Sequence, residues 1–261
     1  CGRRRRPHGL SPDRAPPKLG AMENYKNAHR WLILAFVIVV LGFFRSYWSK
    51  FPDVDFAHHL HLLSATAWFA LLVWQPRLAT TGRLRQHRRN GMIGLFLAGA
   101  VVGTSLLMVP RNIENAVAGI DVGFVDPTFF YGISFFDLVT VAGFSLAVIM
   151  AILTARRPED HALWMISTAF WIIGPAFARL AVLPVVMIRG NLEGLQFFDI
   201  IVPAMGLVLA VIAFVAWRMK RLHPALVLAF LGNTAGFVAE PIGDWEPWRN
   251  FCEAVLLRPS D

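Results

Sequence analysis

Residues 56–89 read FAHHLHLLSATAWFALLVWQPRLATTGRLRQHRR. Three histidines open this segment, an apolar run follows, and a loop rich in arginine closes it. A continuous apolar run of about 20 residues is long enough to cross a bilayer as a helix. Arginine collects in the loops that remain on the cytoplasmic side of a membrane. The segment therefore predicts a membrane span, its direction and, in the histidines, a candidate site.

The rest of the chain has the composition of a multi-pass membrane protein. Of its 261 residues, 56% are hydrophobic and only 16% are charged. Soluble domains usually carry about 25% charged residues. We therefore expect an all-α, polytopic transmembrane helical bundle in a plasma membrane.

We expect three regions along the chain. Residues 1–21 are rich in Arg, Pro and Gly without an apolar period, which predicts a disordered basic leader. Residues 22–239 are expected to form the bundle, and the tail over 240–261 mixes charges with tryptophan, which favours an interfacial position. Seven spans are predicted, or six if the short last one fails, over residues 31–44, 56–78, 90–109, 129–154, 161–188, 197–217 and 222–238.

Charges in the connections predict the orientation. The connections after the second, fourth and sixth spans carry most of the arginine and lysine, and the intervening ones carry few. By the positive-inside rule the basic connections face the cytoplasm, so the amino terminus is inside. Much of the net charge of +8 lies in these loops and in the basic leader, so we expect membrane lipids as partners and no nucleic acid.

Local patterns add three expectations. Residues 110–128 are predicted to form a long connection between the third and fourth spans. Pro175 and Pro184 in the fifth span are expected to bend it, since proline removes a backbone donor. In the third span Gly99 and Gly103, with Gly94 and Ala98, make a small-residue surface at which another helix can pack closely.

Polar residues within spans are costly, so each requires an explanation. Asp137 in the fourth span and Arg179 in the fifth each lie roughly 12 Å below the outer surface, at about 1.5 Å of rise per residue. This shared depth predicts an ion pair, which is either a structural link between helices or a contact for a substrate or ion. Asn233 has a similar depth and Asp199 lies near the outer end of the sixth span. With His61, these residues predict a polar cavity that opens outward.

A metal site is a second hypothesis for the outer side. His58 and His61 are three residues apart and share a helix face. They can ligate one metal ion if a carboxylate such as Asp137, Asp53 or Asp55 completes the shell. Alternatively, they are interfacial histidines whose ring nitrogens are satisfied by water and loop backbone.

Three histidines on the cytoplasmic side, His87, His161 and His223, stand at the starts of spans. A b-type haem with two histidine ligands needs them on different helices at matching depth, and these residues share a depth. The alternative is that they are polar caps at helix starts. No Walker loop, HExxH or GxSxG motif is present, so no enzymatic activity is assigned.

Three motifs resemble those of a group of small bacterial integral-membrane proteins of unknown function. They are WxxLLVxQPxL over residues 68–78, His87-Arg88-x-x-Gly91, and Asp160-His161-Ala-Leu-Trp-Met165. That group carries an HRxxG signature after an early span and a histidine near the start of a later one. Some such families are distantly similar to cytochrome-b-like bundles, so the resemblance, which covers residues 56–180, implies a helical bundle in a bacterial inner membrane more firmly than it implies haem. Opposed histidine pairs at both membrane faces are not evident here.

Three functions remain open from the sequence. The one we favour is the binding or transport of a small ligand or metal ion in the outward-opening cavity. The second is a membrane oxidoreductase or electron carrier that uses b-type haem or a histidine-ligated metal. The third is a subunit for assembly or sensing without chemistry of its own.

Overall fold

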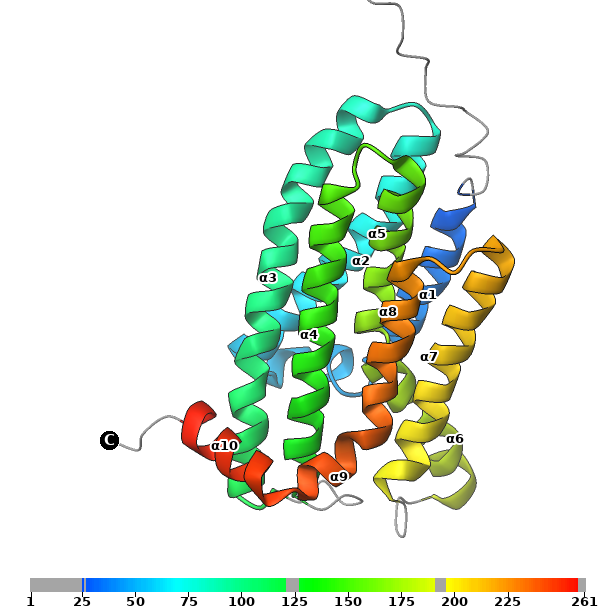
Figure 1. The fold of residues 1–261 in the computed structure, drawn as a ribbon. Helices are drawn as coiled ribbons and strands as arrows, with labels where there is room; N and C mark the ends of the chain where they lie inside the picture. The colour runs from blue at the N-terminus through cyan, green and yellow to red at the C-terminus, as the bar shows by residue number, and fades with distance from the viewer. Residues whose placement is uncertain (1–24, 26, 121–126, 191–195, 258–261) are drawn as a thin grey trace, which may run out of the picture.

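A computed structural model describes residues 25, 27–120, 127–190 and 196–257, and over these residues the chain is helical without strands (Figure 1). The predicted leader over residues 1–21 lies outside the described residues. The α-helices are α1 (Ala28–Gly42), α2 (Phe56–Thr80), α3 (Leu84–Val117), α4 (Phe129–Leu153), α5 (Pro158–Ile172), α6 (Gly174–Arg189), α7 (Phe197–Met219), α8 (Pro224–Asn233), α9 (Ala239–Asp244) and α10 (Glu246–Leu256). Two 3₁₀ helices join them, η2 (Trp48–Asp53) and η3 (Thr234–Val238).

Five helical stretches of the described chain are long and apolar enough to cross a membrane. They are α2, α3, α4, α7 and the continuous run Pro224–Asp244. A sixth crossing is available if α5 and α6, which meet at an angle of 44°, form one broken span. The 15 residues of α1 rise about 22 Å, which is less than the roughly 30 Å of the hydrocarbon core. The multi-pass helical bundle is confirmed at this level of five or six spans.

The turns that carry the arginine clusters lie together at one end of the bundle, the upper end in Figure 1. We call it the basic end. It comprises the α2–α3, α4–α5 and α7–α8 turns, and α1 also begins there. The opposite end contains η2, α9, α10 and the end of α6. The regular alternation of basic and non-basic connections thus corresponds to a physical separation of charge along the bundle.

Helix α3 is longer than expected, because it continues past Pro110 to Val117. The prediction of an irregular connection that starts at residue 110 was therefore wrong in its first part, and residues 121–126 lie outside the described chain. An apolar cluster explains the extension: Ile113 is fully buried with Phe130 of α4 and Cys252 of α10. Packing on this face stabilises the last turns of α3 beyond the proline.

The centre of the bundle is built around two tryptophans. Trp171 of α5 lies against Gly143 of α4 and Gly232 of α8, where a Cβ atom would come within 2.3 and 2.2 Å of the indole ring. Trp68 of α2 donates its indole N–H to Thr168 at 3.1 Å. Because only glycine leaves space for this ring, α4, α5 and α8 pack closely around it.

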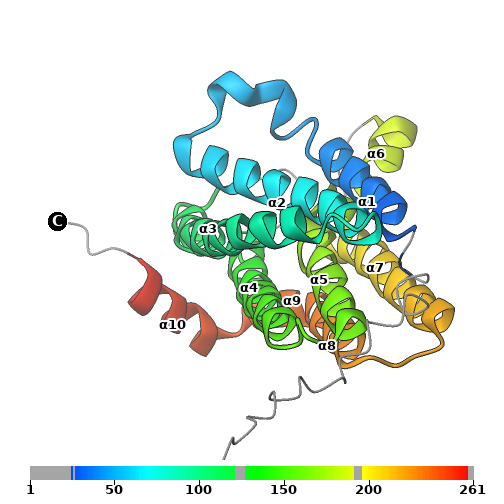
Figure 2. The same cartoon turned by 90° about the horizontal axis from the view of Figure 1, so that it is seen from above.

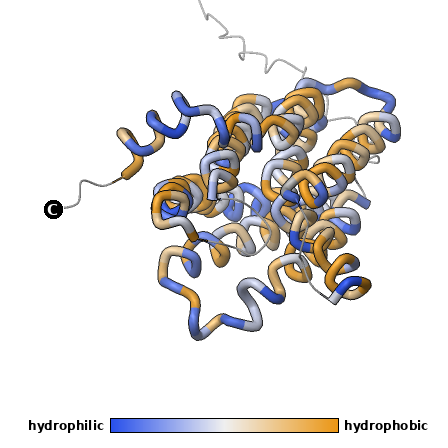
Figure 3. Tube along the Cα trace, turned by 90° about the horizontal axis from the view of Figure 1, so that it is seen from below, coloured by the Kyte–Doolittle hydropathy of each residue, from blue (hydrophilic) through white to orange (hydrophobic). Residues whose placement is uncertain are grey.

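The outer surface of the bundle is also apolar. Large hydrophobic side chains such as Trp31, Phe96 and Leu153 are mostly exposed, and hydrophobic residues lie all round the helices (Figure 3). Gly99 and Gly103 face outward with no neighbouring atom within 4 Å, whereas Gly94 contacts Leu71. The small-residue surface therefore contributes only in part to packing within the chain. An apolar exterior of this kind suits a lipid environment.

The tail forms helix α10, which leaves the bundle sideways (Figure 2). Trp248 donates its indole N–H to the carbonyl of Tyr131 at 2.9 Å, and Cys252 is buried. Phe251 and Val255 are exposed. An amphipathic helix with exposed aromatic and aliphatic side chains is typical of segments at a membrane surface. An interfacial position of the tail therefore stays a prediction.

Candidate functional site

A group of polar side chains, some partly buried and some exposed, lies between the centre of the bundle and the end opposite to the arginines. We call it the inner polar cluster. It draws on four long helices and on the segment after α1. Its members are Ser46, His61, Thr104, Ser105, Asn112, Asp137 and Arg179.

Asp137 of α4 is partly exposed and accepts a hydrogen bond from the side-chain amide of Asn112 on α3 at 3.1 Å. That contact leaves most of the lone pairs of the carboxylate without a partner among the described residues. An ionised carboxylate inside a bundle is costly unless further donors or a cation stabilise it. An ionised Asp137 therefore requires a partner beyond Asn112.

Arg179 of α6 does not supply this partner by direct contact. Its Nε donates to Ser46 at 3.2 Å, one terminal nitrogen donates to the carbonyl of Pro175 at 3.0 Å, and the guanidinium lies 4.3 Å from the ring centroid of Phe43. Asp137 and Arg179 interact electrostatically, but no ion pair joins them in the described part of the chain. The predicted ion pair was wrong, because equal depth was calculated for a straight helix and the fifth span bends at Ile173.

His61 of α2 completes the cluster. Its Nδ1 lies 3.4 Å from the hydroxyl of Ser105 and 3.5 Å from that of Thr104, and its ring interacts electrostatically with Arg179. Ser105, Thr104 and Asn112 were not predicted from the sequence as members of a site. Their helical spacing on the otherwise apolar α3 was the signal that could have identified them.

His58 belongs to a separate group at the start of α2. Its Nδ1 lies 2.5 Å from Asp55, which also accepts from the backbone N–H groups of Ala57 and His58 and pairs with Arg111 at 2.8 Å. Partial desolvation of Asp55 is outweighed by the bonds and charge of His58 and the charge of Arg111, which lower its pKa to about 2. Asp55 is thus the N-cap of α2.

The metal hypothesis finds little support in this arrangement. Over the described residues no group of three or more His, Cys, Asp or Glu side chains could hold a metal ion. His58 is directed to Asp55, and His61 to the hydroxyls of α3. The two histidines thus have different partners although they share a helix face.

Two other predicted members of the cavity lie elsewhere. Asn233 is buried and donates to the carbonyls of Phe170 and Ala229 at 3.3 and 2.8 Å, close to the break that separates α5 from α6. Asp199 accepts from the backbone N–H of Gln196 at 2.9 Å and forms the capping box of α7. One residue links helices at a break and the other caps a helix, so neither contacts the inner polar cluster.

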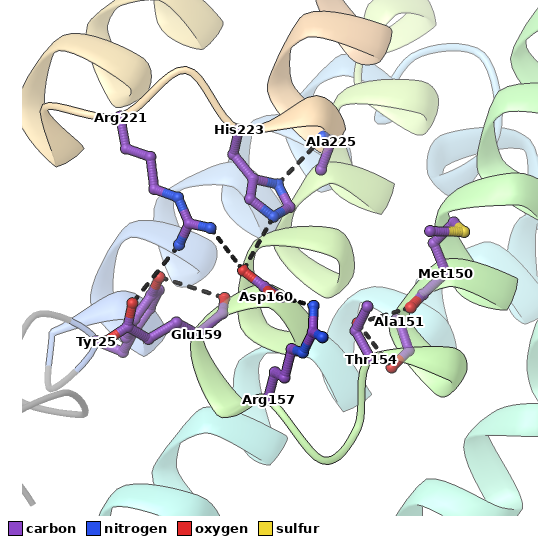
Figure 4. A network of polar contacts seen from close by, with 10 residues as sticks. All are labelled: Tyr25, Met150, Ala151, Thr154, Arg157, Glu159, Asp160, Arg221, His223 and Ala225. Atoms are coloured by element: carbon purple, nitrogen blue, oxygen red, sulfur yellow. Dashed lines mark hydrogen bonds and ion pairs between the residues drawn. The ribbon is translucent and has the colours of Figure 1, made fainter. Parts of the chain in front are cut away.

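The basic end holds a second polar network, centred on Asp160 (Figure 4). Asp160 accepts from Arg221 at 2.8 Å, and its Oδ1 lies 3.4 Å from Nε2 of His223. Nδ1 of His223 accepts from the N–H of Ala225, which makes His223 the N-cap of α8. Burial of His223 and the charge of Arg221 lower its pKa, which Asp160 opposes only in part.

The same network ties the start of the chain to the bundle. Tyr25 donates its hydroxyl to the carbonyl of Glu159 at 3.4 Å. Burial and the charge of Glu159 raise the pKa of Tyr25 to about 12, so the hydroxyl keeps its proton. The carboxylate of Glu159 lies 3.6 Å from Arg221. Direct contacts of this kind indicate a structural role.

His87 and His161, two of the three candidate haem ligands, do lie together. Their rings meet edge to face with centroids 6.1 Å apart. Nδ1 of His161 donates to the carbonyl of Ala151 at 2.8 Å, and Nδ1 of His87 to that of Gln75 at 3.4 Å. A metal-binding histidine usually donates one ring N–H to a carbonyl in this way, which leaves Nε2 as the ligand atom. His223 is engaged with Asp160 and does not join them.

No protein-family model, curated protein or solved structure matches this chain. The geometry of the described residues therefore carries the functional argument alone.

Proposed function

We propose that this chain is a multi-pass protein of the bacterial plasma membrane that binds a small polar ligand in the inner polar cluster. In this proposal α1 serves as a seventh span, and the amino terminus and the basic end face the cytoplasm, as the positive-inside rule favours. The cluster then lies in the outer half of the membrane, and ligands reach it from outside.

The separation of Asp137 from Arg179 carries the proposal. The attraction between two opposite charges in a bundle is strongest when they are in direct contact. A pair with only a structural role should therefore form an ion pair. Here each charge keeps hydrogen-bonding capacity that the described residues do not use. Arg179 is moreover exposed although its charge interacts with residues of α2 and α4. Open space beside the guanidinium, filled by water or by a ligand, accounts for both observations.

The residue types favour a ligand that carries both signs of charge. A guanidinium presents a planar fork that matches a carboxylate. Asp137 and His61 offer acceptors for an amino group a short distance away. A small amino acid satisfies both ends at once, whereas a bare metal ion would be repelled by Arg179 and would lack a third anionic or imidazole ligand.

Water access to the cluster tests this proposal. With the native cysteines replaced by serine, Ser105→Cys places a thiol in the cluster and Leu106→Cys places one on the exposed apolar side of the same helix. We expect a charged, membrane-impermeant thiol reagent added outside intact cells to label the first variant and not the second. Absence of labelling at residue 105, or labelling only from the cytoplasmic side, would exclude an outward-opening cavity.

One observation favours a second function. The edge-to-face contact of His87 and His161, with each Nδ1 bonded to a carbonyl, supports a site for a b-type haem or a metal ion, which would carry single electrons. Absorbance and metal analysis of protein purified in detergent test it. A Soret band that His87→Ala and His161→Ala both remove, and His59→Ala retains, would support the electron carrier; colourless, metal-free protein would reject it.

A further inference from the structure

A groove of ≈ 630 Å³ runs between α7 and α8 next to the basic end. Its size is within the range of small-molecule sites. The walls are apolar or aromatic and include Ala213 and Ala216 on α7 and Phe230 and Leu231 on α8. From Ile212 to Lys220 the groove extends roughly 12 Å along α7, at about 1.5 Å per residue. It therefore has the shape of a channel for a hydrocarbon chain on the outer side of the bundle.

Only the end of the groove is polar, and both polar lining residues are cationic. Arg221 already contacts Glu159 and Asp160, although half of its side chain remains exposed. Lys220 is exposed, and no Asp or Glu of the described chain lies within ion-pair distance of it. The groove thus combines an apolar channel with a positive charge that the chain itself leaves uncompensated.

The backbone of Lys220 is a separate observation. Lys220 is the C-cap of α7 with φ 49° and ψ 34°, the sole non-glycine residue with positive φ in the described chain. Glycine is the usual residue in this left-handed position, because a Cβ atom is strained there by about 1–2 kcal/mol. The turn therefore holds a lysine where stereochemistry favours glycine, and it places that side chain at the mouth of the groove.

We propose that this groove binds one anionic phospholipid from the leaflet at the basic end. One acyl chain lies along Ala213 and Ala216, and the headgroup phosphate contacts Lys220, with Arg221 beside it. Charge complementarity selects the occupant, since the walls discriminate little between apolar chains and the only polar groups are cations. The exposed ring of Trp217 lines the same end, where tryptophan is favoured at the level of lipid headgroups.

Native mass spectrometry of the full chain in a neutral detergent tests the proposal. We expect phosphatidylglycerol to bind more tightly than phosphatidylcholine with the same acyl chains. Lys220→Gly should weaken phosphatidylglycerol binding about fivefold, the contribution of one basic residue near a membrane surface, and should weaken phosphatidylcholine less, because choline offsets the charge of its phosphate. Because glycine suits the left-handed turn, this variant should unfold at a temperature no lower than the wild-type chain.

Two matched variants complete the test. Lys220→Arg keeps the charge and should bind phosphatidylglycerol like the wild-type chain, while Ala213→Trp fills the channel and should weaken both lipids. Equal affinity of the wild-type chain for the two lipids, or unchanged selectivity in Lys220→Gly, would overturn the proposal. So would displacement of phosphatidylglycerol by inorganic phosphate at equal concentration, since the phosphate alone would then account for binding.

Discussion

The two polar regions of this bundle handle charge in opposite ways. At the basic end, Asp160, Arg221 and His223 are in direct contact at 2.8 and 3.4 Å (Figure 4). In the inner polar cluster, Asp137 and Arg179 bond to neutral groups and stay apart. The first arrangement leaves little for a ligand to add, and the second leaves a gap between opposite charges.

Direct contact between opposite charges thus distinguishes polar groups that hold a membrane bundle together from polar groups that are available to a ligand. Charges near the water boundary cost little, and the contacts of Glu159 and Asp160 there fasten α5, the α7–α8 turn and the segment before α1 to one another. Charges within a membrane-spanning segment are costly, so two opposite charges there that do not form an ion pair need a separate reason. Changes in the inner polar cluster should therefore act on ligand binding, and changes at the basic end should act on stability.

The largest effect is expected from exchange of the inner charges. Asp137→Asn and Arg179→Gln should each abolish the thermal shift that the best-binding member of an amino-acid panel produces, since loss of a buried charged contact weakens binding by about thirtyfold or more. The exchange Asp137→Arg with Arg179→Asp should not restore it, because the ligand has fixed polarity. Glu114→Gln, an exposed change on α3, serves as the control. Full recovery in the exchanged protein would show that the two charges serve only the fold.

A smaller effect is expected at the basic end, on stability rather than binding. Asp160→Asn removes the charged partner of Arg221 and His223 and should cost about 1.5–3 kcal/mol, measured as a lower unfolding temperature in detergent. Glu159→Gln, whose contact with Arg221 is longer and more exposed, should cost less than about 1 kcal/mol. Ligand binding should persist in both folded variants. A drop in stability for Glu159→Gln equal to that for Asp160→Asn would contradict the ranking.

The pH dependence of stability should report His223. Its folded pKa is lowered from 6.5, so its contribution is complete above that value and is lost as the pH falls through the folded pKa. Protonation of Nδ1 also removes the bond from Ala225 that caps α8. His223→Asn can keep a cap without titrating, so the unfolding temperature of this variant should vary less between pH 7 and lower pH. Identical pH profiles for the two proteins would exclude His223 as the source.

The smallest effect is expected at the start of α2. Asp55→Ala removes the N-cap and should cost about 1 kcal/mol, whereas Asp55→Asn retains the cap and should cost less. Because the pKa of Asp55 is lowered to about 2, its charge-dependent contribution is present above its ordinary pKa and is lost as the pH falls toward 2. Unfolding temperatures of the three proteins at neutral pH measure the ranking. An alanine variant as stable as the wild-type chain would remove the capping role.

The lengths of the apolar runs predicted most of the fold, because a helix that crosses a bilayer must be long and hydrophobic. The break between α5 and α6 lies next to Pro175, as predicted, whereas Pro184 lies inside α6 and no break is found there. The sequence did not predict how each helix is rotated about its axis, or which side chains therefore meet. Asn233 was predicted to line the cavity, but its side chain donates to backbone carbonyls at the helix break. Ionisable residues are rare inside a membrane span, which is why the sequence identified His61, Asp137 and Arg179. Ser105 was not identified, because a serine hydroxyl in a span usually bonds a carbonyl of its own helix and gives no sign of a site.

The break between α5 and α6 has a consequence for movement. α5 packs mainly against α4 and α8, whereas α6 packs mainly against α1 and α7. Asp137 therefore lies on the first set of helices and Arg179 on the second. Under the proposed function, a ligand that bridges the two charges would join the two sets across the break, so its binding would be thermodynamically linked to the angle between α5 and α6.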